Sequence, residues 1–142
     1  MPRPIEYQHA SEDFDRFLCE VIDQTGLTTR NQAYTTVQGV LYSFRRRLTL
    51  KEAIRFAGAL PPIVRAIFVA DWDLDEAQVP FGDRMAMTQD AQSLRKDHNF
   101  SPPTCIRDVA IALRRCVDER EFDRVLTLLP KEATAFWAVR PT

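Results

Sequence analysis

Clustered arginines are the side chains of this sequence best suited to bind a ligand. Arg45, Arg46 and Arg47 follow one another, and Arg114 and Arg115 form a second basic pair. Guanidinium groups in such clusters bind phosphate and other anions. Basic residues near the end of a helix also complement its dipole and bond its last carbonyl groups without any ligand. We therefore treat the five arginines as a candidate anion or phosphate patch, with helix capping as the alternative.

The overall charge argues against a nucleic-acid interface. The 142 residues include 19 Lys and Arg against 20 Asp and Glu, so the formal net charge is -1. Proteins that bind nucleic acid usually carry a basic excess or a basic surface interleaved with aromatic side chains. Neither is evident here, so the sequence argues against a nucleic-acid partner and favours helix capping for the arginines. Phosphate or nucleic-acid contact through the five arginines stays open as a third functional hypothesis, and it predicts binding that falls steeply with salt.

Three alternating aspartates, Asp71, Asp73 and Asp75, resemble the start of a calcium-binding loop, in which carboxylates converge on one cation. Such a loop has glycine at its sixth position and a bidentate glutamate at its twelfth, but here these positions hold Glu76 and Gly82. We therefore expect a solvated acidic connector and no metal site.

Cysteine and histidine offer little support for catalysis or metal binding. Cys19, Cys105 and Cys116 are odd in number and lack a C-x-x-C spacing, which is typical of reduced thiols in the cytoplasm. The sequence has two histidines, His9 and His98, and neither stands beside a cysteine. Cysteines on apolar helix faces usually behave as small hydrophobic side chains. No catalytic residue is predicted among them.

Motifs that mark common enzyme classes are missing from the sequence. The chain lacks Gly-x-x-x-x-Gly-Lys for phosphate, Gly-x-Ser-x-Gly for a nucleophile, His-Glu-x-x-His for zinc and Gly-x-Gly-x-x-Gly for dinucleotides, and it has four glycines in all. The sequence therefore favours a protein that is not an enzyme and needs no cofactor, while an undescribed activity stays open.

Trp72 and Leu74 form an apolar pair inside the acidic connector. Such a pair either folds back onto the core or serves as the anchor for a partner protein. The aromatic residues at the ends of the two halves, Phe68, Phe136 and Trp137, are expected to lie in the core. We take Trp72 and Leu74 as the candidate partner interface.

Helices must position all of these residues, because apolar side chains recur at helical spacing through most of the chain. In the first half the predicted helices are four: one behind Ser11 that carries Phe14 to Ile22 and ends at Gly26, one from Thr28 or Thr29 to Leu48, one behind a Thr49 and Glu52 capping box to Leu60, and a short one after Pro61-Pro62 that includes Ile63 to Phe68.

The second half follows an acidic connector over residues 71–80 and shows the same kind of pattern. Its predicted helices are a weaker one from Phe81 to Leu94, one behind Ser101 and Pro102-Pro103 that carries Ile106 to Val117, one behind an Asp118 and Glu121 cap and box that carries Phe122 to Leu129, and one from Ala133 to Trp137.

An internal repeat relates the two halves. A shift of 69 positions aligns Ala33 to Phe68 with Pro102 to Trp137 without a gap, and pairs Arg45 with Arg114 and Leu60-Pro61 with Leu129-Pro130. Helical periodicity alone does not place such terminators in register. The sequence predicts an all-α fold, in which two tandem copies of a roughly four-helix unit, residues 11–70 and 81–138, pack into one compact pseudo-twofold bundle. We treat residues 1–142 as a single domain.

The order of these residues resembles a bacterial family of unknown function, domain family 2267, whose members are helical and repeat the unit twice. The second copy departs at residues 98–103, which stand opposite residues 29–34. The resemblance implies a fold and no activity. It covers nearly the whole chain and rests on Phe14, Phe17-Leu18, Val21, Gly26-Leu27, Ala33, Val40-Leu41, Arg47-Leu48, Glu52-Ala53 and Leu60-Pro61.

Two functional hypotheses follow from these patterns. The first is a non-enzymatic helical interaction or scaffold module that binds a protein partner or forms a homodimer. The alternative is a small-ligand-binding bundle or an undescribed enzyme, with a pocket between the copies lined by Met85, Met87, Cys105 or nearby arginines. No apolar stretch is long enough for a signal peptide or a membrane span, so we expect a cytoplasmic protein without membrane contact.

Overall fold

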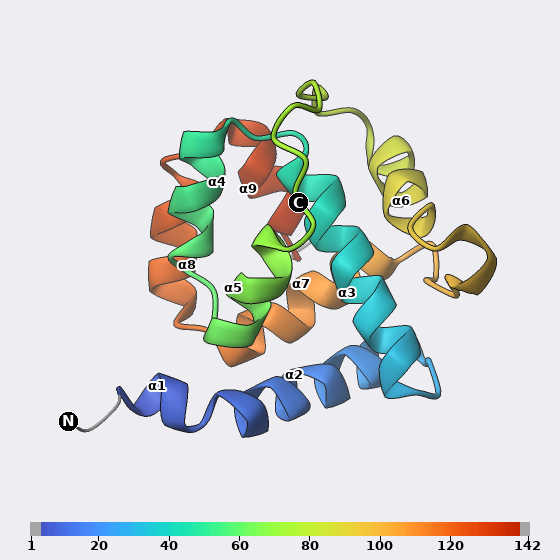
Figure 1. Cartoon of the computed structure of the whole chain (residues 1–142), viewed down its shortest axis with the longest axis vertical. Helices are drawn as coiled ribbons and strands as arrows, with labels where there is room; N and C mark the ends of the chain where they lie inside the picture. Colours follow the sequence, from blue (N-terminus) through green and yellow to red (C-terminus); the bar gives the residue numbers. More distant parts are fainter. Residues whose placement is uncertain (1–3, 140–142) are drawn as a thin grey trace.

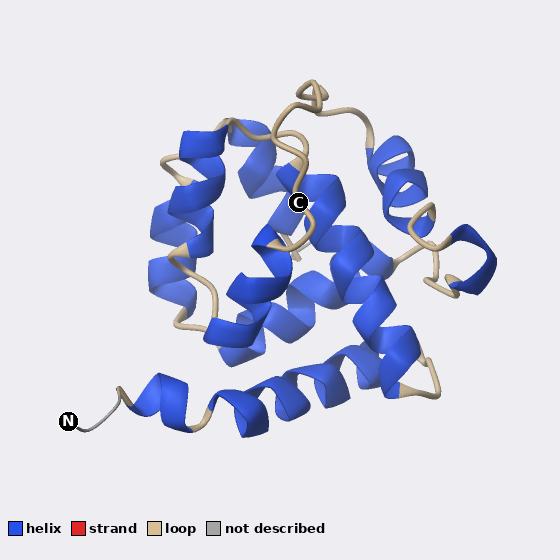
Figure 2. Cartoon of the chain, viewed as in Figure 1, coloured by secondary structure: helices blue, strands red, loops and turns tan. Residues whose placement is uncertain are grey.

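Helices make up the regular structure of the chain in the computed structural model, which describes residues 4–139 (Figure 2). Within those residues there is no strand, and the all-α prediction is confirmed. None of the helices in this part of the chain is long and apolar enough to cross a membrane. The elements are α1 (Ile5–Gln8), α2 (Ala10–Thr25), α3 (Arg30–Arg45), α4 (Leu50–Ala57), α5 (Pro62–Val69), α6 (Arg84–Gln92), a 3-10 turn (Lys96–His98), α7 (Cys105–Cys116), α8 (Glu119–Leu126) and α9 (Lys131–Trp137).

Helices from the two halves of the chain alternate in space (Figure 1). α2 lies along one side and packs on α7, α6 packs along α3, and α4 lies beside α8. α3 also contacts α2, α5 and α7, so it lies at the centre of the arrangement. α2, α3 and α4 therefore each pack on a helix of the second half, whereas α5 packs on α2, α3 and α4 of its own half.

Aromatic rings from both halves meet in the core. Phe44 lies 4.7 Å from Phe56, 4.8 Å from Phe136 and 5.4 Å from Trp137 between ring centroids. Phe56 lies 5.7 Å from Phe122 of the second half. All five side chains are at most 1% exposed, and aromatic pairs at these distances add packing energy beyond the area they bury. The expectation that Phe136 and Trp137 lie in the core is confirmed.

Several helix ends lie where local signals predict them. Thr29 is the N-cap of α3 and forms a capping box with Gln32, and Thr49 is the N-cap of α4 and forms a capping box with Glu52. Gly26 ends α2 with φ at 77°, a left-handed conformation that glycine adopts without steric cost. In the two capping boxes, the side chains accept hydrogen bonds from backbone N–H groups that have no partner within the helix.

The predicted start of the first helix was wrong. α2 begins at Ala10 behind His9, and Ser11 lies inside the helix rather than at its cap. The short α1 before it was not predicted. α6 begins behind Asp83, whose carboxylate accepts from the backbone of Ala86, so the predicted start at Phe81 lies before the helix.

The predicted cap at Ser101 was also wrong, for a tertiary reason. α7 begins at Cys105 behind Thr104, and the Ser101 hydroxyl is buried in a 2.8 Å hydrogen bond with the Thr36 hydroxyl. At the next helix Asp118 caps α8 as predicted, but no reciprocal box forms. The carboxylate that the box required, Glu121, instead accepts two hydrogen bonds from Arg124, one turn further along the exposed face of α8.

The helix bounds agree with the 69-residue shift in part. α4 and α8 have eight residues each and begin 69 residues apart. α5 has eight residues and α9 has seven, and they also begin 69 residues apart. α3 and α7 differ, since α3 has 16 residues and α7 has 12. The tandem repeat itself stays a prediction, and the core contains side chains from both halves.

Candidate functional site

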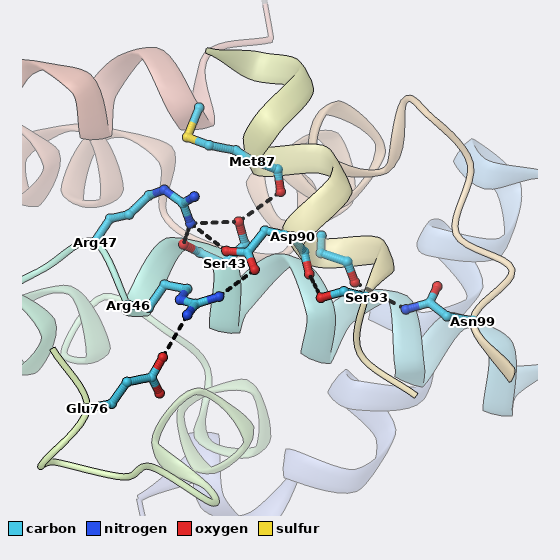
Figure 3. A network of polar contacts seen from close by, with 9 residues as sticks. Ser43, Arg46, Arg47, Glu76, Met87, Asp90, Ser93 and Asn99 are labelled. Carbon is cyan, nitrogen blue, oxygen red and sulfur yellow. Dashed lines mark hydrogen bonds and ion pairs between the residues drawn. The ribbon is translucent and has the colours of Figure 1, made fainter. Parts of the chain in front are cut away.

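Arg46 and Arg47 share one carboxylate on the neighbouring helix α6 (Figure 3). Arg47 donates to one oxygen of Asp90 at 2.8 Å, and Arg46 donates to the other at 2.5 Å. Arg46 also donates to Glu76 of the connector at 2.7 Å. The Arg47 side chain is 5% exposed, so Asp90 compensates a buried positive charge, and Arg47 also donates to the Ser43 carbonyl at 2.6 Å. Such charge-assisted bonds fix the end of α3 against α6 and the connector.

The local sequence explains why the network forms at this place. Arg46 is the C-cap of α3 and Arg47 lies in the following turn, where cations complement the negative end of the helix dipole. α6 reaches α3 closely because Gly39 has no side chain: a Cβ there would lie 2.3 Å from the Ala91 carbonyl oxygen. Asp90 stands beside Ala91 and therefore comes within reach of both arginines.

Arg45 has a different set of contacts, at the end of α5. Its guanidinium donates to the carbonyls of Phe68 and Ala70, each at 2.8 Å, and lies 4.2 Å from the Tyr42 ring centroid and 5.0 Å from that of Trp72. Burial lowers the pKa of Arg45 from its ordinary value, and the neighbouring Tyr42 acts in the opposite direction. Arg45 therefore donates to the last carbonyl groups of α5, and its guanidinium group makes a cation–π contact with the Trp72 ring.

In the second basic pair, Arg114 bonds the end of α9 and Arg115 bonds α2. Arg114 donates to the Trp137 carbonyl at 2.9 Å and lies within 3.1 Å of carboxylate oxygens of Glu119 and Asp123. Arg115 donates to Glu20 of α2 at 2.8 Å. All five arginines of the candidate patch therefore have partners within the chain, and an external anion has to compete with them.

A hollow of about 280 Å³ lies beside the connector on the outer side of Arg45 and Arg46. We call it the connector groove; its apolar wall consists of Leu48, Leu50, Trp72 and Leu74. Trp72 is half-buried against the core, whereas Leu74 is 65% exposed and Leu50 is 51% exposed. The two residues of the candidate interface thus differ: Trp72 packs against the core, and Leu74 faces solvent.

A second hollow, of about 460 Å³, lies between α3 and the end of α6. We call it the interhelix cleft. Arg45, Arg46 and Glu76 line both hollows, so these side chains form the wall between them. The residues that line the cleft are polar except for one leucine: Gln38, Tyr42, Arg45, Arg46, Asp71, Glu76, Asp90, Ser93, Leu94 and Arg95.

Comparison with protein families gives one result. The family model described as "Uncharacterized conserved protein (DUF2267)" matches residues 14–136, which is most of the chain. The chain belongs to the DUF2267 family. A search of curated proteins found no match to it. The family description names no activity, so the function of this DUF2267 chain has to be argued from its hollows and surfaces.

Of the residues expected around a pocket between the copies, Met85, Met87 and Cys105 do not line the interhelix cleft of this DUF2267 chain, whereas arginines do. Met87 and Cys105 are buried in the core, and Met85 is 70% exposed. Burial raises the pKa of the Cys105 thiol to about 11, so this thiol is protonated at neutral pH. Among residues 4–139, no group of three or more His, Cys, Asp or Glu side chains is arranged to hold a metal ion.

Sequence reasoning missed Asp90, Gln38 and Tyr42, which build the network and the cleft. Asp90 stands in the weakest predicted helix and has no motif around it, so nothing in the sequence distinguishes it from a surface carboxylate. One signal was available: Gly39 interrupts a strongly helical stretch, and a glycine inside a helix often marks a close approach of another backbone. That signal indicates the contact with α6 but not the residues beside it.

Proposed function

We propose that this protein is a non-enzymatic cytoplasmic docking module, and that its connector groove binds an apolar segment of a partner protein with basic flanks. The exposure of Leu74 and Leu50 beside Trp72 carries this proposal. Burying a fully exposed leucine contributes about 1.5–3 kcal/mol, so two half-exposed leucines provide the apolar anchor of a protein interface.

The charge of the connector supports a basic partner. Residues 71–80 contain Asp71, Asp73, Asp75 and Glu76 and no Lys or Arg. Glu76 is already paired with Arg46, and Asp73 accepts from the backbone of Asp75, but both carboxylates border the groove. Complementary charges at the rim of an interface increase the rate of association and fix its orientation.

The same charge argues against a second copy of this chain as the occupant of the groove. In a twofold dimer each residue of the interface meets the equivalent surface of the other copy, so two acidic connectors would face each other. Like charges opposed across an interface weaken binding. A different protein with lysines or arginines around one apolar side chain suits the groove better.

Site-specific crosslinking in the cells that produce the protein tests this proposal. A photoreactive amino acid replaces Leu74 in one variant and Leu128, an exposed leucine outside the groove, in the control. We expect one partner to crosslink at position 74 and not at position 128. The same adduct should weaken when Leu50→Ser is added and when salt is raised, because both the apolar wall and the acidic rim contribute.

Light scattering and binding titration complete the test. The purified protein should stay a monomer across a concentration series, and Leu74→Ser should lower its affinity for the identified partner about tenfold, equivalent to about 1.4 kcal/mol. Equal adducts at positions 74 and 128, or a dimer that Leu74→Ser dissociates, would remove the proposal of a heterologous basic partner.

A further inference from the structure

The interhelix cleft lies on the other side of Arg46 from the connector groove and has a different character. Its volume of about 460 Å³ is within the range of small-molecule sites in proteins. α3 supplies one wall, the start of the connector supplies a second and the end of α6 supplies a third. The occupant of such a polar cleft has to satisfy charges and hydrogen bonds rather than bury a large apolar surface.

Three buried polar atoms at the cleft have no hydrogen-bond partner among the described residues. They are Oε1 of Gln38, the hydroxyl of Tyr42 and Nε of Arg46, and Gln38 is only 7% exposed. Native proteins pair nearly all buried polar groups, so three exceptions at one cleft indicate a missing partner. Burial raises the pKa of Tyr42, so its hydroxyl stays protonated and can donate. The walls of the cleft thus contain one buried acceptor and two buried donors that are unpaired.

Two charged residues of opposite sign line the same cleft without a hydrogen bond or ion pair from their side chains to the rest of the described chain. Asp71 lies at the end near Tyr42 and Arg45, where its charge affects the pKa of both. Arg95 follows the C-terminal end of α6. The other acidic side chains of the cleft, Glu76 and Asp90, are already bound to Arg46. One uncommitted anion and one uncommitted cation therefore remain on the walls.

The backbone is strained at both of these residues. Asp71 has φ at 52° and Arg95 has φ at 51°, and no other non-glycine residue within 4–139 has a positive φ. Left-handed backbone is unfavourable for residues with a Cβ and is found often at ligand sites, where surrounding structure maintains it. The strain is thus confined to the two residues that present unpaired charges to the cleft.

We propose that the interhelix cleft binds a small zwitterion of the size of an amino acid or a dipeptide, with its ammonium group at Asp71 and its carboxylate group at Arg95. A simple anion such as phosphate fits less well, because Asp71, Glu76 and Asp90 all border the same space. This site is independent of the partner proposed for the connector groove.

The test uses the full chain labelled with nitrogen-15 and a defined set of probes: the twenty L-amino acids and diglycine. Nitrogen-proton spectra report the Arg46 Nε–H and the Gln38 amide directly, and thermal unfolding reports stabilisation by bound ligand. We expect at least one probe to shift both signals and raise Tm. Its methyl ester and its N-acetyl form each lack one of the two charges, and each should bind at least tenfold more weakly than the parent.

Charge-neutral variants link the binding to the two ends of the cleft. Asp71→Asn and Arg95→Gln should each reduce affinity at least tenfold. Both positions are exposed, and asparagine tolerates left-handed backbone, so the variant at position 71 should fold. Asp75→Asn and Arg107→Gln are the matched controls, because these exposed residues do not line the cleft, and they should leave affinity unchanged.

Four results would overturn the proposal: no shift with any probe, equal binding of a probe and its ester, affinity that neither Asp71→Asn nor Arg95→Gln reduces, or a response to inorganic phosphate alone. Leu74→Ser separates this proposal from the docking function. That variant should bind the zwitterion normally while its affinity for the protein partner falls, so each proposal can fail without the other.

Discussion

Arg45 and Arg114 stand 69 residues apart and make the same contact in the two halves of the chain. Arg45 donates to the carbonyl of Phe68, and Arg114 donates to the carbonyl of Trp137, which is 69 residues further on. The residues that follow them differ. Arg46 joins α3 to Asp90 and Glu76, whereas Arg115 makes an exposed ion pair with Glu20 of α2.

The arginines of each half thus have two different roles: one bonds the end of a helix, and the next one contacts a neighbouring element. Arg45 in the first half and Arg114 in the second each donate to a carbonyl group at the end of a helix. The next arginine in each half, Arg46 or Arg115, contacts the structure that surrounds this helix end. In the first half that surrounding structure is α6 and the connector, where the connector groove and the interhelix cleft lie. In the second half it is α2, and Arg115 lines a separate, smaller hollow of about 210 Å³ against that helix.

The largest predicted effect comes from removing the carboxylate that Arg46 and Arg47 share. Asp90→Ala leaves the buried Arg47 without an anionic partner among the described residues, and loss of one member of a buried pair costs about 3–5 kcal/mol. Glu20→Ala removes the exposed partner of Arg115 and should cost less than about 1 kcal/mol. Urea unfolding of both variants measures the difference, and equal costs would contradict the contrast between the halves.

Substitution of Gly39 should have the next largest effect. In Gly39→Ala the new Cβ meets the Ala91 backbone, which cannot rotate away, so α6 has to move at a cost of about 1–3 kcal/mol. Gly58→Ala is the control, since its Cβ meets nothing closer than 3.4 Å and its φ is helical at -62°. That control should be neutral or stabilising by about 0.4–1 kcal/mol. Thermal unfolding distinguishes the two, and an unchanged Tm for Gly39→Ala would contradict the close packing.

Neutral replacements of Arg45 and Arg114 test whether the two helix ends are stabilised in the same way. Arg45→Met and Arg114→Met should each lose about 1.5–3 kcal/mol, because each removes charged hydrogen bonds to the end of a helix. The two costs should agree within about 1 kcal/mol. Chemical unfolding checks this, and a large cost at one site alone would show that the shared carbonyl contact does not dominate at both.

The smallest predicted effect concerns Asp108, which stands 69 residues after Gly39. Its burial raises the pKa of the carboxyl, against the opposing hydrogen bond from Thr104. A raised folded-state pKa favours the protonated form, so this group stabilises the fold most below the ordinary aspartate pKa. That contribution is lost as pH rises through the folded-state pKa. Asp108→Asn should remove this part of the pH dependence of unfolding, measured from pH 3 to 7; an unchanged profile would assign the dependence to other groups.

The helices were predictable because their signals are local. Thr29, Thr49 and Gly26 act on backbone groups within a few residues, so the sequence around them is sufficient. Ser101 shows where such reasoning fails. A serine before two prolines looks like a helix cap, but contact with Thr36, 65 residues away, decides its conformation.

The candidate sites were less predictable, because they depend on the packing of α6. The connector and its two apolar residues can be identified from composition, and Leu74 is exposed. The cleft needs Gln38, Tyr42 and Arg46 to meet residues from a weakly patterned helix. No spacing within the sequence indicates which face of that helix turns towards α3.

The alternation of the two halves has a consequence for dissection of the molecule. α2 packs on α7, α3 on α6 and α4 beside α8, so a fragment that ends in the connector loses the surfaces that cover its own helices. Two such fragments, residues 1–74 and 75–142, should each be poorly folded alone and recover helical structure when mixed. The chain is therefore suited to reconstitution from two separately expressed polypeptides, with the cut placed at the apex of the connector.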